Sequence, residues 1–508
     1  MRLMMRLRVL MRLRVLLLVT HLSTTRAAVA MCARSPSRGP VGRDGKPLKA
    51  MLAGGGIGGL CAALVLKNRG FEVAVYEKAT EYKPFGGPIQ IASNALESLL
   101  LIDKEVYGEI IQAATVIGNR KNGLKDGISN EWFATFDLLT PAQNRGQETS
   151  IVIDRPILQD ILLRKVKRDV TIGAEVVGFE PHADGSRVTG ILSDGSRVEA
   201  DLLVGSDGIR SRTRQALDPR LPELPAWSGY TCFAAIANCV PSDIKEVGYK
   251  VFLGHRKYFV SVDVGAGRIQ WYAFLNIPPG QAKALCPRGT ELEWLKRTQF
   301  AEWSPEVHQL IDCTPEDQVE QRDLYDRPPE LNWVNGRVCL LGDAAHPMMP
   351  NLGQGGGMAI EDALVLGQEL SEVLDPAAVP LALKKYNQKR GLRAAAVQGM
   401  SRLSSAILFQ YNHPTEVSIW PPSIRNYGPR SVITRACQGF LQRVAFPLQF
   451  EYLFSFPGDA VDPTVFAEVE AGDFRGPGGE EAAGPRRRGE VEGELGKIPL
   501  ADWMKKYW

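Results

Sequence analysis

The chain has 508 residues, of which 44% are hydrophobic and 23% are charged, and its net charge is +3. This composition is typical of a globular chain with two or three domains. Residues 1–50 carry eleven Lys and Arg against one Asp, a net charge of +10 that leaves −7 for the rest. A mildly acidic body without a basic stripe argues against a nucleic-acid partner. The spacing of Cys and His predicts no metal site, and no apolar run is long enough to predict a transmembrane helix.

Residues 1–46 have the features of a targeting presequence. Met1–Arg14 is rich in Arg and lacks acidic residues, a short apolar run follows at Val15–Val19, and Ala28–Ala30 resembles a signal-peptidase site. Met31–Arg43 is again basic and free of acidic residues, like a transit peptide. A signal followed by a transit segment predicts a plastid reached through the secretory route. A single secretory signal and a disordered basic arm are the alternatives.

A glycine-rich segment after Leu48 predicts a dinucleotide site. An apolar strand runs into Gly54-x-Gly56-x-x-Gly59, then into a helix and a second strand that ends at Glu77. In such a unit the glycines permit a tight turn and a close backbone approach to pyrophosphate, while the helix N-terminus faces the phosphates. The acid favours a free ribose 2′-hydroxyl, as in FAD or NAD rather than NADP. A purely structural turn is the alternative.

The middle of the chain is predicted to be mixed α and β structure. A strand at Ile151–Arg155 precedes a helix, and Leu202–Val204 is a buried strand that leads into Asp207-Gly208. Asp-Gly turns predict a small antiparallel set at Glu175–Glu180, Arg187–Leu192 and Ser196–Glu199. Four further strands are expected at Tyr230–Ala237, Lys250–Leu253, Tyr258–Asp263 and Arg268–Asn276. Their aromatic residues either line an apolar channel or form plain core: Phe252, Tyr258, Phe259, Trp271, Tyr272 and Phe274.

The last predicted strand, Val338–Leu341, ends at Gly342-Asp343, and ligands collect at the carboxyl ends of parallel strands. His346 follows, and we interpret it as a residue that orders this loop rather than as a catalytic base. A glycine-rich loop at Pro350–Gly357 then precedes a long helix that begins near Gly355. Such a loop, poor in side chains, lets backbone N–H groups approach a ligand closely.

Three of these motifs occur together in a known family. Gly54–Gly59 with Glu77, Asp207–Ser211 and Gly342–Pro347 resemble the single-component flavin monooxygenases related to p-hydroxybenzoate hydroxylase. The resemblance implies an α/β (α+β) fold, in which a Rossmann-like FAD-binding domain is split in sequence and carries an inserted β-sheet substrate domain. The expected ranges are 47–225 and 331–456 for the two parts of the FAD-binding domain and its C-terminal helices, 226–330 for the substrate domain, and 457–508 for a mostly disordered linker and tail.

The same resemblance implies roles toward a tightly but non-covalently bound FAD. Asp207 and Gly208 would lie near the pyrophosphate, Asp343 would bind a ribityl hydroxyl, and Arg155 would lie near the phosphate and ribose. Pro350 would wall the site together with three glycines of the loop, whose N–H groups and helix N-terminus would stabilise negative charge on the reduced flavin: Gly353, Gly355 and Gly356. No catalytic side chain is assigned, because a flavin C4a-hydroperoxide formed with O2 would carry the chemistry.

Longer segments narrow the resemblance to the zeaxanthin epoxidases of plastids, over roughly Ala50–Arg393. The matching segments are Gly87–Leu99, Asn122–Ser129, Ser228–Phe233, Val247–Gly265, Gln270–Phe274, Arg322–Pro329 and Pro350–Ala363. One departure is Gly86, where the family pattern has an Arg. Many family members also carry a forkhead-associated domain near the C-terminus, and no phosphopeptide-binding function is expected here.

The implied reaction converts zeaxanthin through antheraxanthin to violaxanthin, with O2 as oxidant and NAD(P)H or ferredoxin as electron donor. Because the xanthophyll substrate is dissolved in lipid, peripheral contact with the thylakoid membrane of a chloroplast is expected. The segment Ser431–Phe454 either lies in the membrane interface or forms a buried C-terminal helix. Two alternative functions are an FAD-dependent aromatic hydroxylase of a small phenol and a non-catalytic FAD-fold protein that binds isoprenoid lipid.

Overall fold

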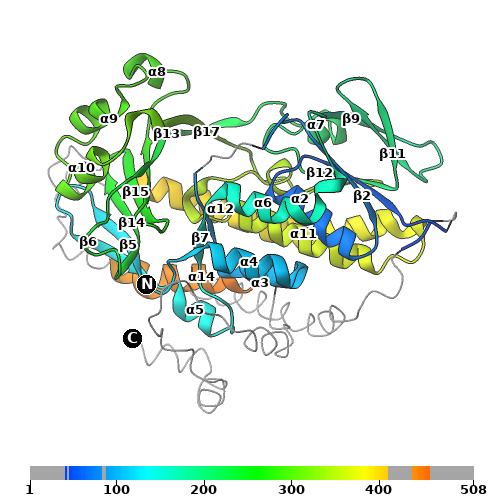
Figure 1. Ribbon diagram of the computed structural model, residues 1–508, viewed down its shortest axis with the longest axis horizontal. Helices are drawn as coiled ribbons and strands as arrows, with labels where there is room; N and C mark the ends of the chain where they lie inside the picture. Colours follow the sequence, from blue (N-terminus) through cyan, green and yellow to red (C-terminus); the bar gives the residue numbers. More distant parts are fainter. Residues whose placement is uncertain (1–39, 43–44, 83–86, 410–437, 458–508) are drawn as a thin grey trace, which may run out of the picture. The chain divides into compact units, whose positions relative to one another are not determined.

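The computed structural model describes residues 40–42, 45–82, 87–409 and 438–457 (Figure 1). The predictions for residues 1–39, Gly86 and 458–508 therefore lie outside the described residues, as does the part of Ser431–Phe454 before residue 438. None of the described helices is both long and apolar enough to cross a bilayer.

A six-stranded sheet carries the glycine-rich turn. Its strands follow the order β18–β19–β12–β1–β2–β8, and all neighbours are parallel except β18 and β19. The central strands have almost wholly apolar sequences because protein covers both faces of the sheet. The strands are β1 (Lys49–Ala53), β2 (Glu72–Glu77), β8 (Val170–Ile172), β12 (Leu202–Gly205), β18 (Val334–Asn335) and β19 (Val338–Leu340).

A seven-stranded sheet holds the aromatic segment, in the order β17–β13–β16–β15–β14–β5–β6. Five of its strands fall within the expected range 226–330, but β5 and β6 come from residues 121–136, and β5 joins by pairing parallel with β14. The strands are β5 (Lys121–Asp126), β6 (Trp132–Phe136), β13 (Ala226–Ala237), β14 (Val247–Gly254), β15 (Lys257–Asp263), β16 (Ile269–Leu275) and β17 (Glu320–Asp326).

Two small antiparallel sheets complete the β structure. One has the order β11–β10–β9 and confirms the set predicted from the Asp-Gly turns; the other has the order β3–β7–β4. Their strands are β3 (Ile89–Ile91), β4 (Thr115–Val116), β7 (Ile151–Ile153), β9 (Val176–Pro181), β10 (Val188–Leu192) and β11 (Arg197–Ala200).

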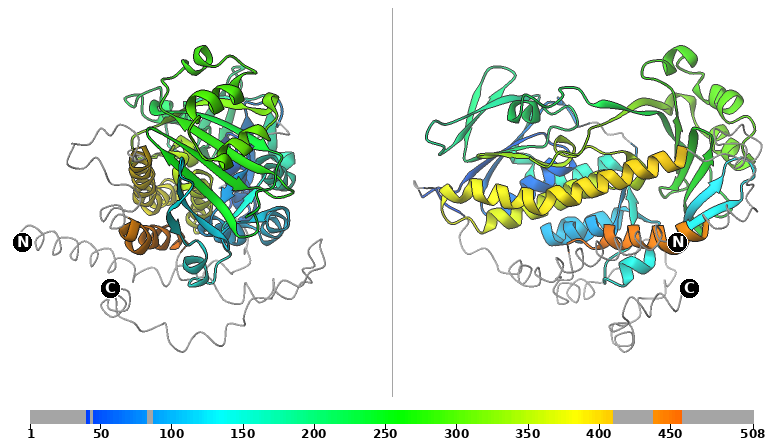
Figure 2. Two further views of the ribbon diagram at one scale, coloured as in Figure 1. Left: turned by 90° about the vertical axis from the view of Figure 1, so that its left-hand side faces the viewer. Right: turned by 180° about the vertical axis from the view of Figure 1, so that it is seen from behind.

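The helices connect and cover these sheets. The long helix α12 contacts β18 and β19 of the parallel sheet and β14 and β15 of the seven-stranded sheet, as Figure 2 shows. Helix α11 packs against α2, α3 and α12. The main helices are α2 (Ile57–Asn68), α3 (Ser93–Ile102), α4 (Lys104–Ala113), α5 (Leu139–Gln143), α6 (Arg155–Val166), α7 (Arg212–Leu217), α8 (Ala282–Leu285), α9 (Glu291–Trp294), α10 (Pro305–Asp312), α11 (Gly355–Ser371), α12 (Val379–Phe409) and α14 (Phe446–Phe454).

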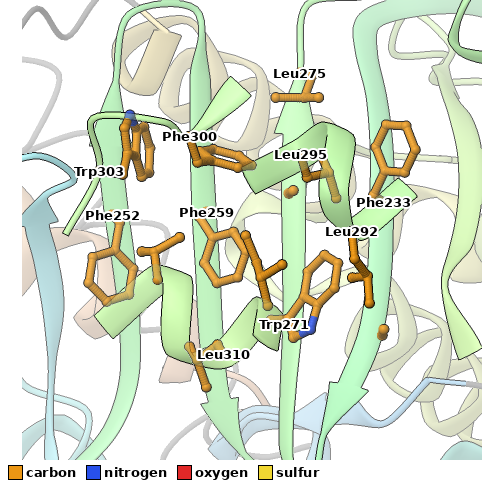
Figure 3. Close-up of a cluster of buried hydrophobic side chains, with 14 of the residues drawn as sticks. Phe233, Phe252, Phe259, Trp271, Leu275, Leu292, Leu295, Phe300, Trp303 and Leu310 are labelled. Carbon is orange, nitrogen blue, oxygen red and sulfur yellow. The ribbon is translucent and has the colours of Figure 1, made fainter. Parts of the chain in front are cut away.

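One face of the seven-stranded sheet is closed by a core under α8, α9 and α10 (Figure 3). Phe252, Phe259 and Trp271 point into this core, and Phe259 stacks on Trp271 with ring centroids 5.3 Å apart. Because side chains alternate between the two faces of a strand, the neighbouring aromatic residues point to the opposite face. These three of the six aromatic residues named from the sequence are therefore core.

Candidate cofactor-binding site

The glycine-rich turn between β1 and α2 is built around two close backbone contacts. Gly54 has φ +105°, and a Cβ there would meet the carbonyl oxygen of Ser206, which begins the loop after β12. A Cβ on Gly59 would meet the carbonyl oxygen of Gly54 and lie 2.7 Å from Oγ of Ser206. These two positions therefore exclude side chains through contacts within the protein itself.

Gly56 is different, because a Cβ there would meet no described atom within 4 Å. It is also the N-cap of α2, and no side chain caps this helix end. The first N–H groups of a helix need an acceptor when no cap supplies one, and the helix dipole favours an anion. The turn thus leaves both space and hydrogen-bond donors for a phosphate group.

The predicted ribose-binding acid, Glu77, lies at the end of β2 and holds this turn. Its Oε2 accepts a hydrogen bond from the N–H of Gly55 at 2.7 Å, and its Oε1 accepts one from Ala79 at 2.8 Å. Tyr82 donates to the carbonyl oxygen of Gly55 at 3.3 Å. Burial, and secondarily the charge of Glu77, raises the pKa of Tyr82 to about 12. A carboxylate oxygen accepts more than one hydrogen bond, so the ribose role stays a prediction.

Asp207 and Gly208 follow β12 beside the glycine turn. Oδ2 of Asp207 accepts hydrogen bonds from the backbone N–H and the hydroxyl of Thr213, at 2.9 and 3.0 Å. Its Oδ1 is buried and has no partner among the described residues. Gly208, with φ +78°, lines a cavity next to this turn, and Asp207 does not.

A cavity of about 700 Å³ connects the glycine turn with the seven-stranded sheet. At the turn its wall includes Gly56, Gly59 and Gly208, together with Arg155 at the start of α6 and Asp343 after β19. The side chains of Arg155 and Asp343 are exposed to this space, and neither has a hydrogen bond to another described residue. Burial raises the pKa of Asp343, while the charges of His346 and Arg155 oppose that shift. The structure thus leaves one cation and one acid on the cavity wall for a polar ligand.

The loop after Asp343 is fixed by a buried histidine. His346 has its Nε2 2.5 Å from Oδ2 of Asp362 in α11, and the same oxygen accepts the N–H of Gly342 at 2.9 Å. Burial alone would raise the pKa of Asp362, but the charges of His346 and Arg390 outweigh it and lower the pKa to about 2. The structure agrees with the interpretation of His346 as a residue that orders the loop.

The glycine-rich loop forms another part of the cavity wall. Pro350 begins a short 3-10 turn, Gly353 follows with φ +62°, and Gly355 and Gly356 start α11. All four line the cavity. A Cβ on Gly356 would lie 2.8 Å from Cδ1 of Ile89 in β3, so protein packing as well as the cavity limits this position.

The apolar end of the cavity lies at the face of the seven-stranded sheet opposite to α8–α10, where Leu408 of α12 and Phe446 of α14 also pack. Tyr258 and Phe274 stack with centroids 4.4 Å apart, and Tyr272 lies beside them. The hydroxyl of Tyr258 donates to Oδ1 of Asn351 at 3.1 Å, and that of Tyr272 donates to the carbonyl oxygen of Pro88 at 3.3 Å. These three of the six aromatic residues therefore line the cavity. Several other residues line the cavity without any local sequence pattern that marks them, and they were not predicted: Gln90, Ser206, Tyr249, Met349, Asn351 and Leu408.

These features fit a dinucleotide at the glycine turn. Gly56 leaves an open backbone cradle, and the N-terminus of α2 lacks a side-chain cap. Within the described residues, no group of three or more His, Cys, Asp or Glu lies together as a metal site would require.

Comparison with known proteins agrees with this geometry. Chloroplastic zeaxanthin epoxidases of Solanum lycopersicum and Arabidopsis thaliana are 46% and 44% identical to this chain over 390 and 380 residues. The alignments cover 74% and 72% of this chain but 57% and 56% of those proteins, so the chain spans little more than half of their length.

Solved structures share the fold. Klebsiella pneumoniae HpxO, complexed with FAD and uric acid, is 30% identical with a TM-score of 0.64, covering 71% of this chain and 89% of that one. A salicylate hydroxylase substrate complex, 21% identical, has the same TM-score and covers 84% of this chain and 98% of that one. The fold class predicted from the sequence is confirmed. The family model described as FAD binding domain matches residues 48–226 and 318–401, more than half of the chain, and the protein therefore belongs to that family.

Proposed function

We propose that the protein is an FAD-dependent monooxygenase that epoxidises the β-rings of xanthophylls, converting zeaxanthin through antheraxanthin to violaxanthin with O2. The observation that carries this proposal is the identity of 44–46% to proteins named zeaxanthin epoxidase, over 380–390 residues. Each alignment is longer than residues 48–226 and 318–401 taken together, which the family model matches. The likeness therefore extends beyond the FAD-binding domain.

The cavity supports this proposal because it joins a polar end to an apolar end. FAD, when bound and reduced, supplies the activation of O2 that such a reaction needs. Glu77, Asp343 and Arg155 would hold its polar groups, and Gly355 and Gly356 would place backbone against its ring. The aromatic wall at Tyr258, Tyr272 and Phe274 would orient an apolar ring substrate and exclude water from the reacting atoms.

The proposal also covers the electron donor and the location of the protein in the cell. We assign NAD(P)H or ferredoxin as the donor and a plastid, at the thylakoid membrane, as the location. The relatives are named chloroplastic, which supports the plastid. Peripheral membrane contact is supported by large apolar side chains exposed on α12 and on the helical segment that ends with α14: Leu392 and Leu403 of α12, Phe440, and Leu448 of α14.

The test is to incubate the purified protein with lipid-dispersed zeaxanthin, reductant and isotopically labelled O2, and then to separate the pigments. A mono-epoxide followed by a di-epoxide, each carrying label, is expected. β-Carotene should react poorly if the site hydrogen-bonds the 3-hydroxyl of the ring, because its absence would leave buried polar groups unpaired. Carotenoid products without label would overturn the monooxygenase assignment.

Hydroxylation of a small aromatic compound is the second candidate. It is favoured by the likeness to HpxO, whose structure holds uric acid. Turnover of small aromatic compounds together with none of zeaxanthin would select this candidate. A holoprotein that consumes no O2 with any reductant would instead indicate a non-catalytic protein that binds isoprenoid lipid.

A further inference from the structure

The loop that lines the cavity is connected to a largely buried charge network in α11 and α12. Glu361 is wholly buried, and its two carboxylate oxygens accept bonds from Arg390 at 2.6 Å and from Arg393 at 2.8 Å. Burial raises the pKa of Glu361, but the two arginine charges and their hydrogen bonds lower it further than burial raises it. Glu361 is therefore a fixed acceptor of hydrogen bonds.

Asn94, near the start of α3, is the residue that joins this network to the loop. Its Nδ2 donates to Oε1 of Glu361 at 2.7 Å and to Oε1 of Gln354 at 3.0 Å, and all three side chains are buried. Because an ionised carboxylate only accepts, Glu361 dictates that the NH2 end of the Asn94 amide faces it. That orientation in turn selects the oxygen end of the Gln354 amide as the one that faces Asn94.

Gln354, whose amide this hydrogen bond orients, lies in the loop that lines the cavity. It is the N-cap of α11, and its carbonyl oxygen accepts the N–H of Met358 at 2.8 Å. Gly353 precedes it with a left-handed backbone, and Gly355 and Gly356 follow it on the cavity wall. A loop made mostly of glycine has little conformational preference of its own, so a buried side-chain anchor within it has a large effect on its conformation.

We infer that Asn94 is a positioning residue of the FAD site, which orients Gln354 and thereby fixes the backbone from Gly353 to Gly356 along the cavity. The inference rests on the proposed function only in placing FAD in this cavity, and it is independent of the substrate. Arg393 of the same network also donates to the carbonyl oxygens of Tyr452 and Leu453 in α14, at 3.1 and 2.7 Å.

The experiment compares N94L, Q354M and the double variant with the matched control S98A. Ser98 is also wholly buried in α3, and its hydroxyl donates to the carbonyl oxygen of Asn94 at 2.7 Å, so S98A removes a buried bond without touching the amide. FAD titration of the apoprotein and the absorption spectrum of bound FAD are the measurements. N94L and Q354M should each raise the FAD dissociation constant about tenfold and shift the spectrum, and S98A should do neither.

The double variant decides whether the two residues act through one another. If they do, its FAD dissociation constant equals that of the weaker-binding single variant, because the second change removes nothing further. Fully additive effects, or equal effects of N94L and S98A, would overturn the inference. Should N94L fail to fold, Q354M tests the same bond and leaves the bond between Asn94 and Glu361 intact. If the wild type does not turn over zeaxanthin but the variants show the expected FAD results, only the substrate assignment is wrong.

Discussion

Nε2 of His346 lies 2.5 Å from Oδ2 of Asp362, and both side chains are almost completely buried. The pair joins α11 to the turn that carries Asp343, since the same carboxylate oxygen accepts the N–H of Gly342. The other ring nitrogen of His346 is buried and has no partner among the described residues. The histidine is thus placed to hold the loop and not to exchange protons with a ligand in the cavity.

We expect His346→Ala to lower the free energy of unfolding by about 3 kcal/mol, because it removes a buried ring and its hydrogen bond to Asp362, which keeps Arg390 as a partner. FAD should also bind more weakly, since the Asp343 turn loses its support. Chemical denaturation and FAD titration measure the two effects. The pH dependence of turnover in any residual activity should be unchanged, and loss of a basic pKa from that profile would show that His346 acts as a base.

Two glycines of the same turn should behave in opposite ways. Gly56→Ala places a methyl group where the protein has no atom within 4 Å, so the apoprotein should unfold at the same denaturant concentration as the wild type, but FAD affinity should fall at least tenfold. Gly59→Ala forces a methyl group against the carbonyl oxygen of Gly54 and should destabilise the apoprotein itself. Equal FAD affinity of the Gly56→Ala variant and the wild type would show that FAD does not approach this backbone.

Asp343→Ala should reduce FAD retention more than it reduces stability. Asp343 has no hydrogen bond to another described residue. Its carboxyl lies on the cavity wall, where reduced contact with water raises its pKa. Because this side chain is exposed to the cavity and makes no such hydrogen bond, its removal should leave the unfolding free energy of the apoprotein within about 1 kcal/mol of the wild type. Asp343→Asn is the matched variant, because it keeps the shape and a hydrogen-bonding group. Gel filtration with flavin absorbance measures retention.

The two faces of the seven-stranded sheet should separate substrate binding from stability. Phe259 lies in the core under α8–α10 and Phe274 lines the cavity, although both are aromatic residues of adjacent strands. Phe259→Leu should cost about 1–2 kcal/mol of stability with an unchanged KM. Phe274→Leu should instead raise KM for zeaxanthin several-fold. Paired denaturation and steady-state measurements test this difference, and equal KM values for the two variants would contradict it.

Stability should fall as pH rises from about 4.5 to 7, because of Glu97. This side chain of α3 is buried, and burial, and secondarily the charge of Glu148, raises its pKa from 4.5 to about 7. In that range the folded state binds a proton that the unfolded state has lost, so deprotonation costs folding free energy. Glu97→Gln should weaken this dependence and stabilise the protein at pH 8 by about 2 kcal/mol, while Glu148, whose pKa burial also raises, keeps part of it. Unfolding curves at several pH values measure the slopes, and equal slopes for the variant and the wild type would show that Glu97 is not responsible.

Much of the candidate site follows from local patterns in the sequence. The spacing of Gly54, Gly56 and Gly59, the Asp-Gly turns and the buried strand before Asp343 depend on backbone conformation over a few residues, and the structure has these elements where they were expected. Such signals are reliable because a positive φ or a close backbone contact restricts the residue at a single position.

The remaining features depend on contacts between distant parts of the chain. The sequence shows that aromatic residues alternate along the strands that hold Phe259 and Phe274. Which of these two residues faces a cavity depends on helices α8–α10, which cover one side of the sheet. The pairing of β5 with β14, and the bonds of Asn94 to Gln354 and Glu361, join residues more than 100 positions apart. A contact between residues so far apart in the sequence depends on the packing of the whole chain, and the conformational preferences of the nearby residues do not predict it.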